Sequence, residues 1–266
     1  MSASEGNAIV SDGTIVEHRD GSVLRLVVNN PAQRNALTPA MLEELAGSYD
    51  RASSDAGIKV VVLSGEGSVF SGGYSVGSFP TGRDLVEHDE LTAAADSIER
   101  CSKATLAVLN GDAIGAAFDL ALANDFRIIT TTARVGITPA RFGLVYSWQG
   151  IQRAVDVLGQ HTARRLLLTG ELADAERALA FGAVDEVADG DGLGALEARW
   201  IECLSNVAPL SVSGMKHVLR LVSRSTPSDA DRRAVLELRR QAIDSADVHE
   251  ARDAFRSKRR PEFTGA

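Results

Sequence analysis

The chain has 266 residues, of which 44% are apolar and 24% charged, and it carries a formal net charge of -8 at pH 7. Such a chain can bury a sizeable core, and its acidic balance argues against nucleic acid or an anionic membrane as the main partner. No apolar run approaches the roughly 18 residues of a membrane span, no N-terminal signal pattern is found, and the two cysteines lack metal-ligand spacing, so we expect a cytoplasmic protein without a metal site.

The first half of the chain alternates between strand and helix patterns. Residues 22–30 (SVLRLVVNN) alternate and are β-branched, which predicts a strand that leads into the loop PAQRNAL. Thr38 followed by Pro39 is a helix-start signal, and the apolar spacing that follows predicts a helix to about residue 52. Further strands are predicted over 58–65, 104–109 and 126–131, with a helix marked by Leu91, Ala94 and Ile98 between the first two.

The second half is mostly helical in pattern. Helices are predicted over 149–158, 160–168 and 174–181, and three more from residue 191 to the end. Strand-helix alternation followed by a helical tail predicts an α/β core with a C-terminal helical cap.

Two glycine-rich loops, 65–79 (GEGSVFSGGYSVGSF) and 110–119 (NGDAIGAAFD), each leave a predicted strand and enter a helix. Such turns expose backbone N–H groups at a helix start, and two of them facing one point would form an oxyanion hole. GEGSVF also imitates the start of a dinucleotide-binding GxGxxG, but Phe70 occupies the place of the third glycine. Two purely structural turns remain the other alternative.

GEGSVFSGGYSV resembles the thioester-binding loop of the crotonase (enoyl-CoA hydratase/isomerase) superfamily, and NGDAIGAAFDLALANDFRI resembles its second signature. RNAL (34–37) and the segments 168–187, 208–216 and 255–263 match further landmarks in family order. The resemblance implies a spiral of ββα units with a C-terminal helical region. It suggests a spiral core over 1–200, a trimerisation or capping region over 201–266, and a homotrimer or dimer of trimers.

The resemblance also implies which residues form the site. The oxyanion donors become the backbone N–H groups of Tyr74 and Ala116, and the substrate is an acyl-CoA thioester with no cofactor beyond its own CoA. Basic residues would bind the CoA phosphates. The residues implied to bind substrate or CoA are Arg34, Ala36, Gly72, Gly73, Gly115, Thr138, Lys258 and Arg259.

Two further positions bear on the reaction. The first glutamate of family hydratases falls on Asp119, and the second falls on Pro139, which carries no acid. Because Asp119 lies in an apolar segment, we expect either a function or a buried partner for it. TPARFGLVYSWQGI (138–151) resembles the methylmalonyl-CoA decarboxylase branch of the superfamily, which implies that Tyr146 orients the departing carboxylate.

We therefore expect an acyl-CoA lyase that decarboxylates methylmalonyl-CoA or an analogue through a thioester enolate stabilised by the oxyanion hole. One alternative is an enoyl-CoA hydratase or isomerase that uses Asp119. The other, of a different class, is a non-catalytic acyl-CoA binding subunit.

Overall fold

The structure is a computed structural model that describes residues 13–75, 89–223 and 246–259, with the single residues 233, 236, 240 and 244. The loop 78–84, which resembles its counterpart in the decarboxylase branch, lies outside the described residues. Within those ranges, every helix is too short or too polar to cross a bilayer.

A six-stranded sheet forms the centre of the described chain. Its strands are β1 (Thr14–Asp20), β2 (Val23–Asn29), β3 (Val60–Gly65), β4 (Ala104–Leu109), β6 (Phe126–Thr130) and β9 (Glu186–Ala188). They follow one another across the sheet in this order, β1 antiparallel to β2 and all others parallel. The β-branched run of β3 and the apolar run of β4 are buried on both faces, as in a covered parallel sheet.

A smaller sheet lies beside the first. Its strands are β5 (Ala113–Ile114), β7 (Arg134–Gly136) and β8 (Ala173–Asp174), and an isolated bridge pairs Ser71 with Ala113. Three successive chain segments repeat one pattern. Each adds one strand to the large sheet (β3, β4 or β6), then a short extended piece to the small sheet (Ser71, β5 or β7), and then continues into a helix. This repeat is the expected spiral of ββα units.

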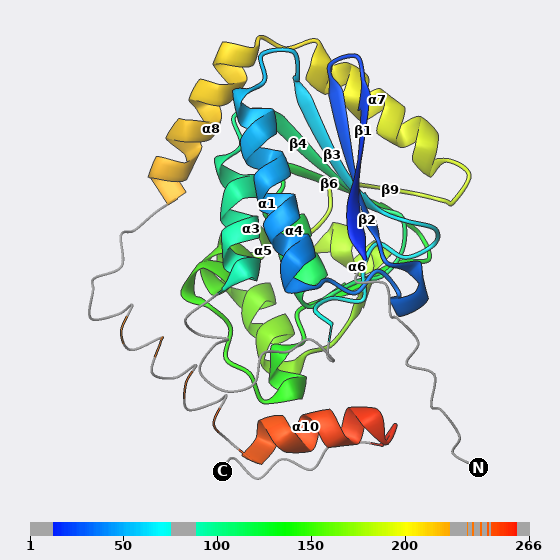
Figure 1. Cartoon of the computed structure of the whole chain (residues 1–266), viewed down its shortest axis with the longest axis vertical. Coiled ribbons are helices and arrows are strands. Elements are labelled where there is room, and N and C mark those ends of the chain that lie inside the picture. The colour runs from blue at the N-terminus through cyan, green and yellow to red at the C-terminus, as the bar shows by residue number, and fades with distance from the viewer. Residues whose placement is uncertain are drawn as a thin grey trace, which may run out of the picture.

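Helices cover both faces of the large sheet (Figure 1). On one face lie α1 (Pro39–Ser54), α3 (Glu90–Arg100) and α4 (Ala116–Leu122), and on the other lies α7 (Leu193–Ser205). Side chains alternate along a strand. Val61 and Leu63 accordingly join the core under α1, whereas Val60 and Val62 join the core under α7.

The predicted helix start at Thr38 is confirmed by its cap. The Thr38 side chain accepts a hydrogen bond from the Met41 N–H at the start of α1. The helix α5 (Trp148–Thr169) is broken at Gly159, with φ 70° and ψ 158°, which matches the two separate helices predicted there. Three short helical segments lie elsewhere in the chain: η1 (Pro31–Gln33), η3 (Pro139–Phe142) and α6 (Ala175–Ala180).

The C-terminal region is helical where it is described. The helix α8 (Pro209–Ser223) is joined to the core by Lys216, whose Nζ lies 2.6 Å from Asp125 Oδ2, next to β6. The helix α10 (Ala246–Arg256) lies at the bottom of Figure 1 and meets η3 through Phe255 and Phe142, whose ring centroids are 6.4 Å apart. The division of the chain at residue 200 falls within α7 and stays a prediction.

Candidate active site

Three loops meet beyond the carboxyl ends of β2, β3 and β4, the edge at which open α/β sheets bind ligands. Main-chain hydrogen bonds join them. The N–H of Gly72 donates to the Arg34 carbonyl at 2.9 Å, and the N–H of Ser71 donates to the Asp112 carbonyl at 3.0 Å. The sequence-predicted loops RNAL, GEGSVFSGGYS and NGDAIG thus form one continuous framework.

Asn35 fixes the first loop against the second. Its side chain is fully buried, and its Nδ2 donates to the carbonyls of Glu66 and Val69 at 2.9 and 2.7 Å. Its Oδ1 accepts from the Asn30 N–H at 3.0 Å, and Asn30 in turn donates to the Ala36 carbonyl. Both Arg34 and Asn35 have φ of 54°. Sequence reasoning did not single out Asn35, although an asparagine suits a left-handed backbone position.

The N–H of Tyr74 faces away from the first loop. Leu37 pairs with the chain on either side of Tyr74, since its N–H donates to the Gly73 carbonyl and its carbonyl accepts from the Ser75 N–H, both at 2.8 Å. Successive N–H groups of an extended chain point to opposite sides. The Tyr74 N–H therefore points towards the side opposite Leu37.

Gly73 brings the second and third loops into close contact. Its φ is 95°, and a Cβ there would lie 2.4 Å from the Ile114 carbonyl oxygen and 3.6 Å from the Ala116 nitrogen. Only a glycine fits at such a position. The two peptide groups expected to donate, those of Tyr74 and Ala116, thus belong to segments in direct contact.

Ala116 is the first residue of α4, so its N–H has no partner inside the helix. The preceding residue, Gly115, has φ 59°, and its N–H donates to the Gly136 carbonyl at 2.8 Å. A Cβ at Gly115 would lie 3.2 Å from the Thr138 hydroxyl oxygen, and Thr138 is buried. Gly115, Ala116 and Thr138 thus lie close together, and their roles in substrate binding stay a prediction.

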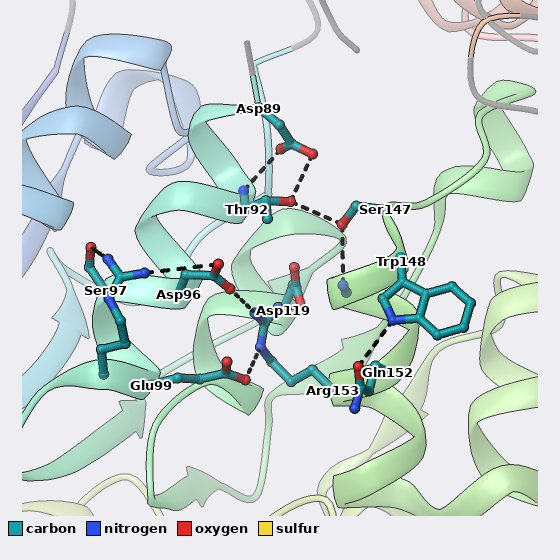
Figure 2. A network of polar contacts seen from close by, with 12 residues as sticks. Asp89, Thr92, Asp96, Ser97, Glu99, Asp119, Ser147, Trp148, Gln152 and Arg153 are labelled. Atoms are coloured by element: carbon teal, nitrogen blue, oxygen red, sulfur yellow. Dashed lines mark hydrogen bonds and ion pairs between the residues drawn. The ribbon is translucent and has the colours of Figure 1, made fainter. Parts of the chain in front are cut away.

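Asp119 has the buried partner that its apolar surroundings required. Arg153 Nη1 lies 2.7 Å from Asp119 Oδ1, and each side chain is only 2% exposed. The same guanidinium contacts Glu99 Oε1 at 2.7 Å and Asp96 Oδ1 at 3.4 Å (Figure 2). Sequence reasoning missed Arg153, since a contact between residues 34 positions apart leaves no local pattern.

The pKa values of this pair follow from burial and charge. Burial raises the pKa of the Asp119 carboxyl, and the Arg153 charge and hydrogen bond offset only part of that rise. Burial alone would lower the pKa of Arg153, but the negative charges of Asp119 and Glu99 outweigh burial and raise it. Arg153 therefore stays a cation throughout the range in which proteins work.

Tyr146 presents a buried phenol next to Asp119. Its ring packs on Gly150, where a Cβ would lie 2.7 Å from two ring carbons. Its hydroxyl makes no hydrogen bond of normal geometry within the described part of the chain. Burial and then the Asp119 charge raise the pKa of Tyr146 well above 10, and burial also raises that of Tyr74. Both phenols are neutral hydrogen-bond donors at physiological pH.

The segment that carries Tyr146 is tied to α3. The Thr92 hydroxyl lies 2.7 Å from Asp89 Oδ2 and 3.0 Å from Ser147 Oγ (Figure 2). Ser147 in turn accepts a hydrogen bond from the Gly150 N–H and caps α5. The residue after Tyr146 is thus held from two sides.

The basic residues fall into two places. Arg34 is exposed, 3.3 Å from Asp112 Oδ2, which also binds Arg134 Nη2 at 2.7 Å. Lys258 and Arg259 follow α10 at exposed positions, and Arg259 pairs with Glu250 at 2.7 Å. Both of these residues are hydrogen-bonded to α10, since the N–H groups of Lys258 and Arg259 donate to the carbonyls of Phe255 and Ala254.

Comparison with known proteins identifies the class of protein that this fold and site define. Residues 18–266 match the Enoyl-CoA hydratase/isomerase family, and the chain belongs to that family. It has the crotonase fold and is an enzyme of the class that acts on CoA thioesters.

Individual relatives differ in their reactions. Methylmalonyl-CoA decarboxylase of Escherichia coli (strain K12) is 27% identical, over 87% of this chain and 90% of its own. (E)-Benzylidenesuccinyl-CoA hydratase of Thauera aromatica is 30% identical, over 92% of this chain and 96% of its own. A solved structure of methylmalonyl-CoA decarboxylase in complex with 2-nitronate-propionyl-CoA is similar with a TM-score of 0.88 and 25% identity, over 95% of this chain and 99% of that one.

Proposed function

We propose that the chain decarboxylates methylmalonyl-CoA or a close analogue. The observation that carries the proposal is the Tyr146 phenol, whose hydroxyl is buried beside Asp119, stays protonated and makes no hydrogen bond of normal geometry within the described residues. It lies next to an acid, Asp119, that is already engaged by Arg153. The likeness to methylmalonyl-CoA decarboxylase in sequence and structure supports the same reaction.

The thioester carbonyl would accept hydrogen bonds from the N–H groups of Tyr74 and Ala116. Loss of CO2 breaks the bond between Cα and the carboxyl carbon, and its electron pair passes into the thioester as an enolate. Negative charge then develops on the thioester oxygen, where preformed donors stabilise it. Removing one such donor costs about 2.7–4 kcal/mol in the transition state, so two of them supply a large share of the barrier reduction.

Tyr146 would hold the departing carboxylate. The bond to be broken must stand roughly perpendicular to the thioester plane, so that its electrons overlap the carbonyl, and a single phenol donor fixes this orientation without a cation that would stabilise the ionised ground state. A proton from water or from a neighbouring acid then adds to Cα and completes the turnover. The reaction needs no cofactor besides the CoA of the substrate.

The CoA portion would extend from the thioester along the loops. We propose that Gly72, Gly73, Gly115, Ala36 and Thr138 line its thioester end. The basic residues Arg34, Lys258 and Arg259 are proposed for its phosphates, and Arg34 would exchange Asp112 for a phosphate oxygen. Because Lys258 and Arg259 follow α10, a neighbouring subunit of a homotrimer or dimer of trimers is the proposed source of these two cations.

The second candidate reaction is hydration or isomerisation of an enoyl-CoA, favoured by the 30% identity to a hydratase. Hydration would require Asp119 to move a proton, although Arg153 already binds one of its oxygens at 2.7 Å. The second acid of the two-glutamate route is also missing, because Pro139 stands at that position. The contact of Arg153 with Asp119 and the proline at position 139 therefore both favour decarboxylation over hydration.

The deciding experiment is mass spectrometry after incubation with methylmalonyl-CoA and, separately, with crotonyl-CoA. We expect propionyl-CoA from the first and no change in the second.

Tyr146→Phe should lower kcat roughly tenfold or more, which corresponds to about 1.4 kcal/mol of barrier. Tyr49→Phe is the matched control, since Tyr49 is buried and bonded to Asn124 in the core. Hydration of crotonyl-CoA without decarboxylation of methylmalonyl-CoA would refute the proposal, and binding of the CoA esters with turnover of neither would support the alternative of a binding subunit.

A further inference from the structure

Arg153 is surrounded by carboxylates from two other helices. Asp119 reaches it from α4, and Asp96 and Glu99 reach it from α3, while Arg153 itself lies on α5. The contact with Asp119 is the innermost, because both of those side chains are 2% exposed, whereas Asp96 and Glu99 are about one quarter exposed. Figure 2 shows the guanidinium between the three acids.

A guanidinium does not lose its proton in a protein, and it favours the ionised form of a carboxylate within hydrogen-bond distance. We propose that Arg153 is a positioning residue of the active site, which opposes the effect of burial and favours the ionised form of Asp119 beside Tyr146, and which occupies one carboxylate oxygen so that Asp119 takes no part in proton transfer. The proposal rests on the proposed function in one respect, the role of Tyr146 as the donor to the substrate.

The charged groups around Asp119 act in known directions. Arg153, from α5, lowers the pKa of Asp119, and Glu99, from α3, raises it. Tyr146, from the segment before α5, faces the same carboxyl, and Asp96 reaches it only through Arg153. The strand β5 also packs against α4, and it has no ionisable side chain.

Two substitutions should therefore move the titration of Asp119 in opposite directions. Arg153→Met removes the cation and should raise the midpoint by about one pH unit or more. Glu99→Gln removes a negative neighbour, leaves Arg153 in place, and should lower the midpoint. These two shifts test whether the charges of Arg153 and Glu99 set the ionisation of Asp119, and turnover tests what that ionisation means for the reaction.

The experiment is a pH titration by infrared difference spectroscopy, without substrate. Each protein is compared with the same protein carrying Asp119→Asn, so that the difference reports the carboxylic acid of Asp119 alone. Arg127→Met is the matched control, because Arg127 is a buried arginine that bonds Asn124 and Ala183 in the core. We expect its Asp119 midpoint to equal that of the parent.

Arg153→Lys keeps the charge and serves if Arg153→Met does not fold. Its midpoint should stay within about one pH unit of the parent. The proposal is overturned if Glu99→Gln leaves the midpoint unchanged or raises it, or if Arg153→Met folds and leaves the midpoint unchanged.

Turnover separates this proposal from the proposed function. If Asp119 takes no part in proton transfer, Asp119→Asn should lower kcat for the accepted substrate by less than about tenfold. A general acid or base contributes typically about 10²–10⁴-fold, so a hundredfold loss would overturn the role given to Arg153. Failure to decarboxylate methylmalonyl-CoA would refute the proposed function alone, because the infrared titration needs no substrate.

Discussion

At the scale of single residues, Gly73 controls the distance between the two oxyanion segments. Gly73→Ala would force a side chain into a left-handed backbone position and to within 2.4 Å of the Ile114 carbonyl oxygen. We expect the loops to separate and kcat/KM to fall about a hundredfold or more, as when an oxyanion donor is lost. Steady-state kinetics with the accepted thioester measures the effect.

The control for that prediction is Gly67→Ala in the same loop. Gly67 has φ 69°, but a Cβ there would meet nothing within 4 Å. This variant therefore carries the backbone strain, about 1–2 kcal/mol, without the clash. If both variants lost the same activity, strain in the loop and not the approach of Gly73 to Ile114 would be responsible.

Asp112 gives a pH-dependent contribution to stability. Partial burial opposes its ionisation, but hydrogen bonds from Arg134 and the charges of Arg134 and Arg34 outweigh it and lower the pKa of Asp112. Because the pKa is lower in the folded state, this stabilisation is present above the unfolded pKa of about 3.9 and is lost as the pH falls through the folded value.

We therefore expect Asp112→Asn to lower the free energy of unfolding near neutral pH by about 0.5–1 kcal/mol. The difference from the parent should shrink towards acidic pH. Urea denaturation at a series of pH values tests this, with Arg134→Gln as the companion variant that removes the same contact. A difference that grows towards acidic pH would contradict the sign of the pKa shift.

At the scale of elements, a largely buried cation ties α8 to the residues just before β4 and β6. Lys216 Nζ contacts Asp125 Oδ2 at 2.6 Å and the Lys103 carbonyl at 2.8 Å. Hydrogen bonds to charged groups contribute about 1.5–3 kcal/mol, so Lys216→Met should speed amide exchange across α8 roughly tenfold or more. Hydrogen exchange followed by mass spectrometry reads this out.

The neighbouring substitution His217→Gln is the control, since His217 is exposed on the same helix. It should leave exchange in α8 unchanged. Equal exchange in Lys216→Met and the parent would mean that other contacts of α8, such as that of Arg220 with the Glu99 carbonyl, and not the ion pair, hold α8 in place.

Sequence patterns predicted the long elements and missed the short ones. The strands β2, β3, β4 and β6 and the helix α1 were predicted because each has a clear periodicity or a cap. The strands β7, β8 and β9 have two or three residues, too few for any period, and their pairing depends on distant segments. The strand β1 is mostly exposed at the sheet edge, so no buried face marks it.

The same limit applies to the site. The glycines of its loops were found because their spacing is local and resembles that of a family. Arg153 was missed because its contact with Asp119 exists only after α4 and α5 pack together. Asn35 was missed because its partners, the Glu66 and Val69 carbonyls, are main-chain groups with no sequence signal.

At the scale of the whole molecule, α8 carries apolar side chains that no other described residue covers. Met215, Val218 and Leu219 recur at helical spacing and are 59%, 55% and 66% exposed. Clustered apolar exposure marks a contact surface. We expect the protein to sediment as a homotrimer or a dimer of trimers. The double variant Val218→Lys, Leu219→Glu should dissociate this assembly and sediment at a lower mass.

Leu168→Glu is the control for the sedimentation experiment. Leu168 is 73% exposed at the end of α5, away from the α8 cluster in sequence, and its substitution should leave the mass unchanged. A parent protein that sediments as a monomer at micromolar concentration would contradict the expected assembly.

The main-chain character of the two proposed donors has a consequence for how this family diversifies. A peptide N–H survives every substitution at positions 74 and 116 except proline, so mutation cannot easily abolish enolate stabilisation there. Side chains such as Tyr74, Asp119 and Tyr146 are then free to vary over generations without loss of the shared first step. The similar sequence identities of this chain to a decarboxylase and to a hydratase agree with such an evolutionary history.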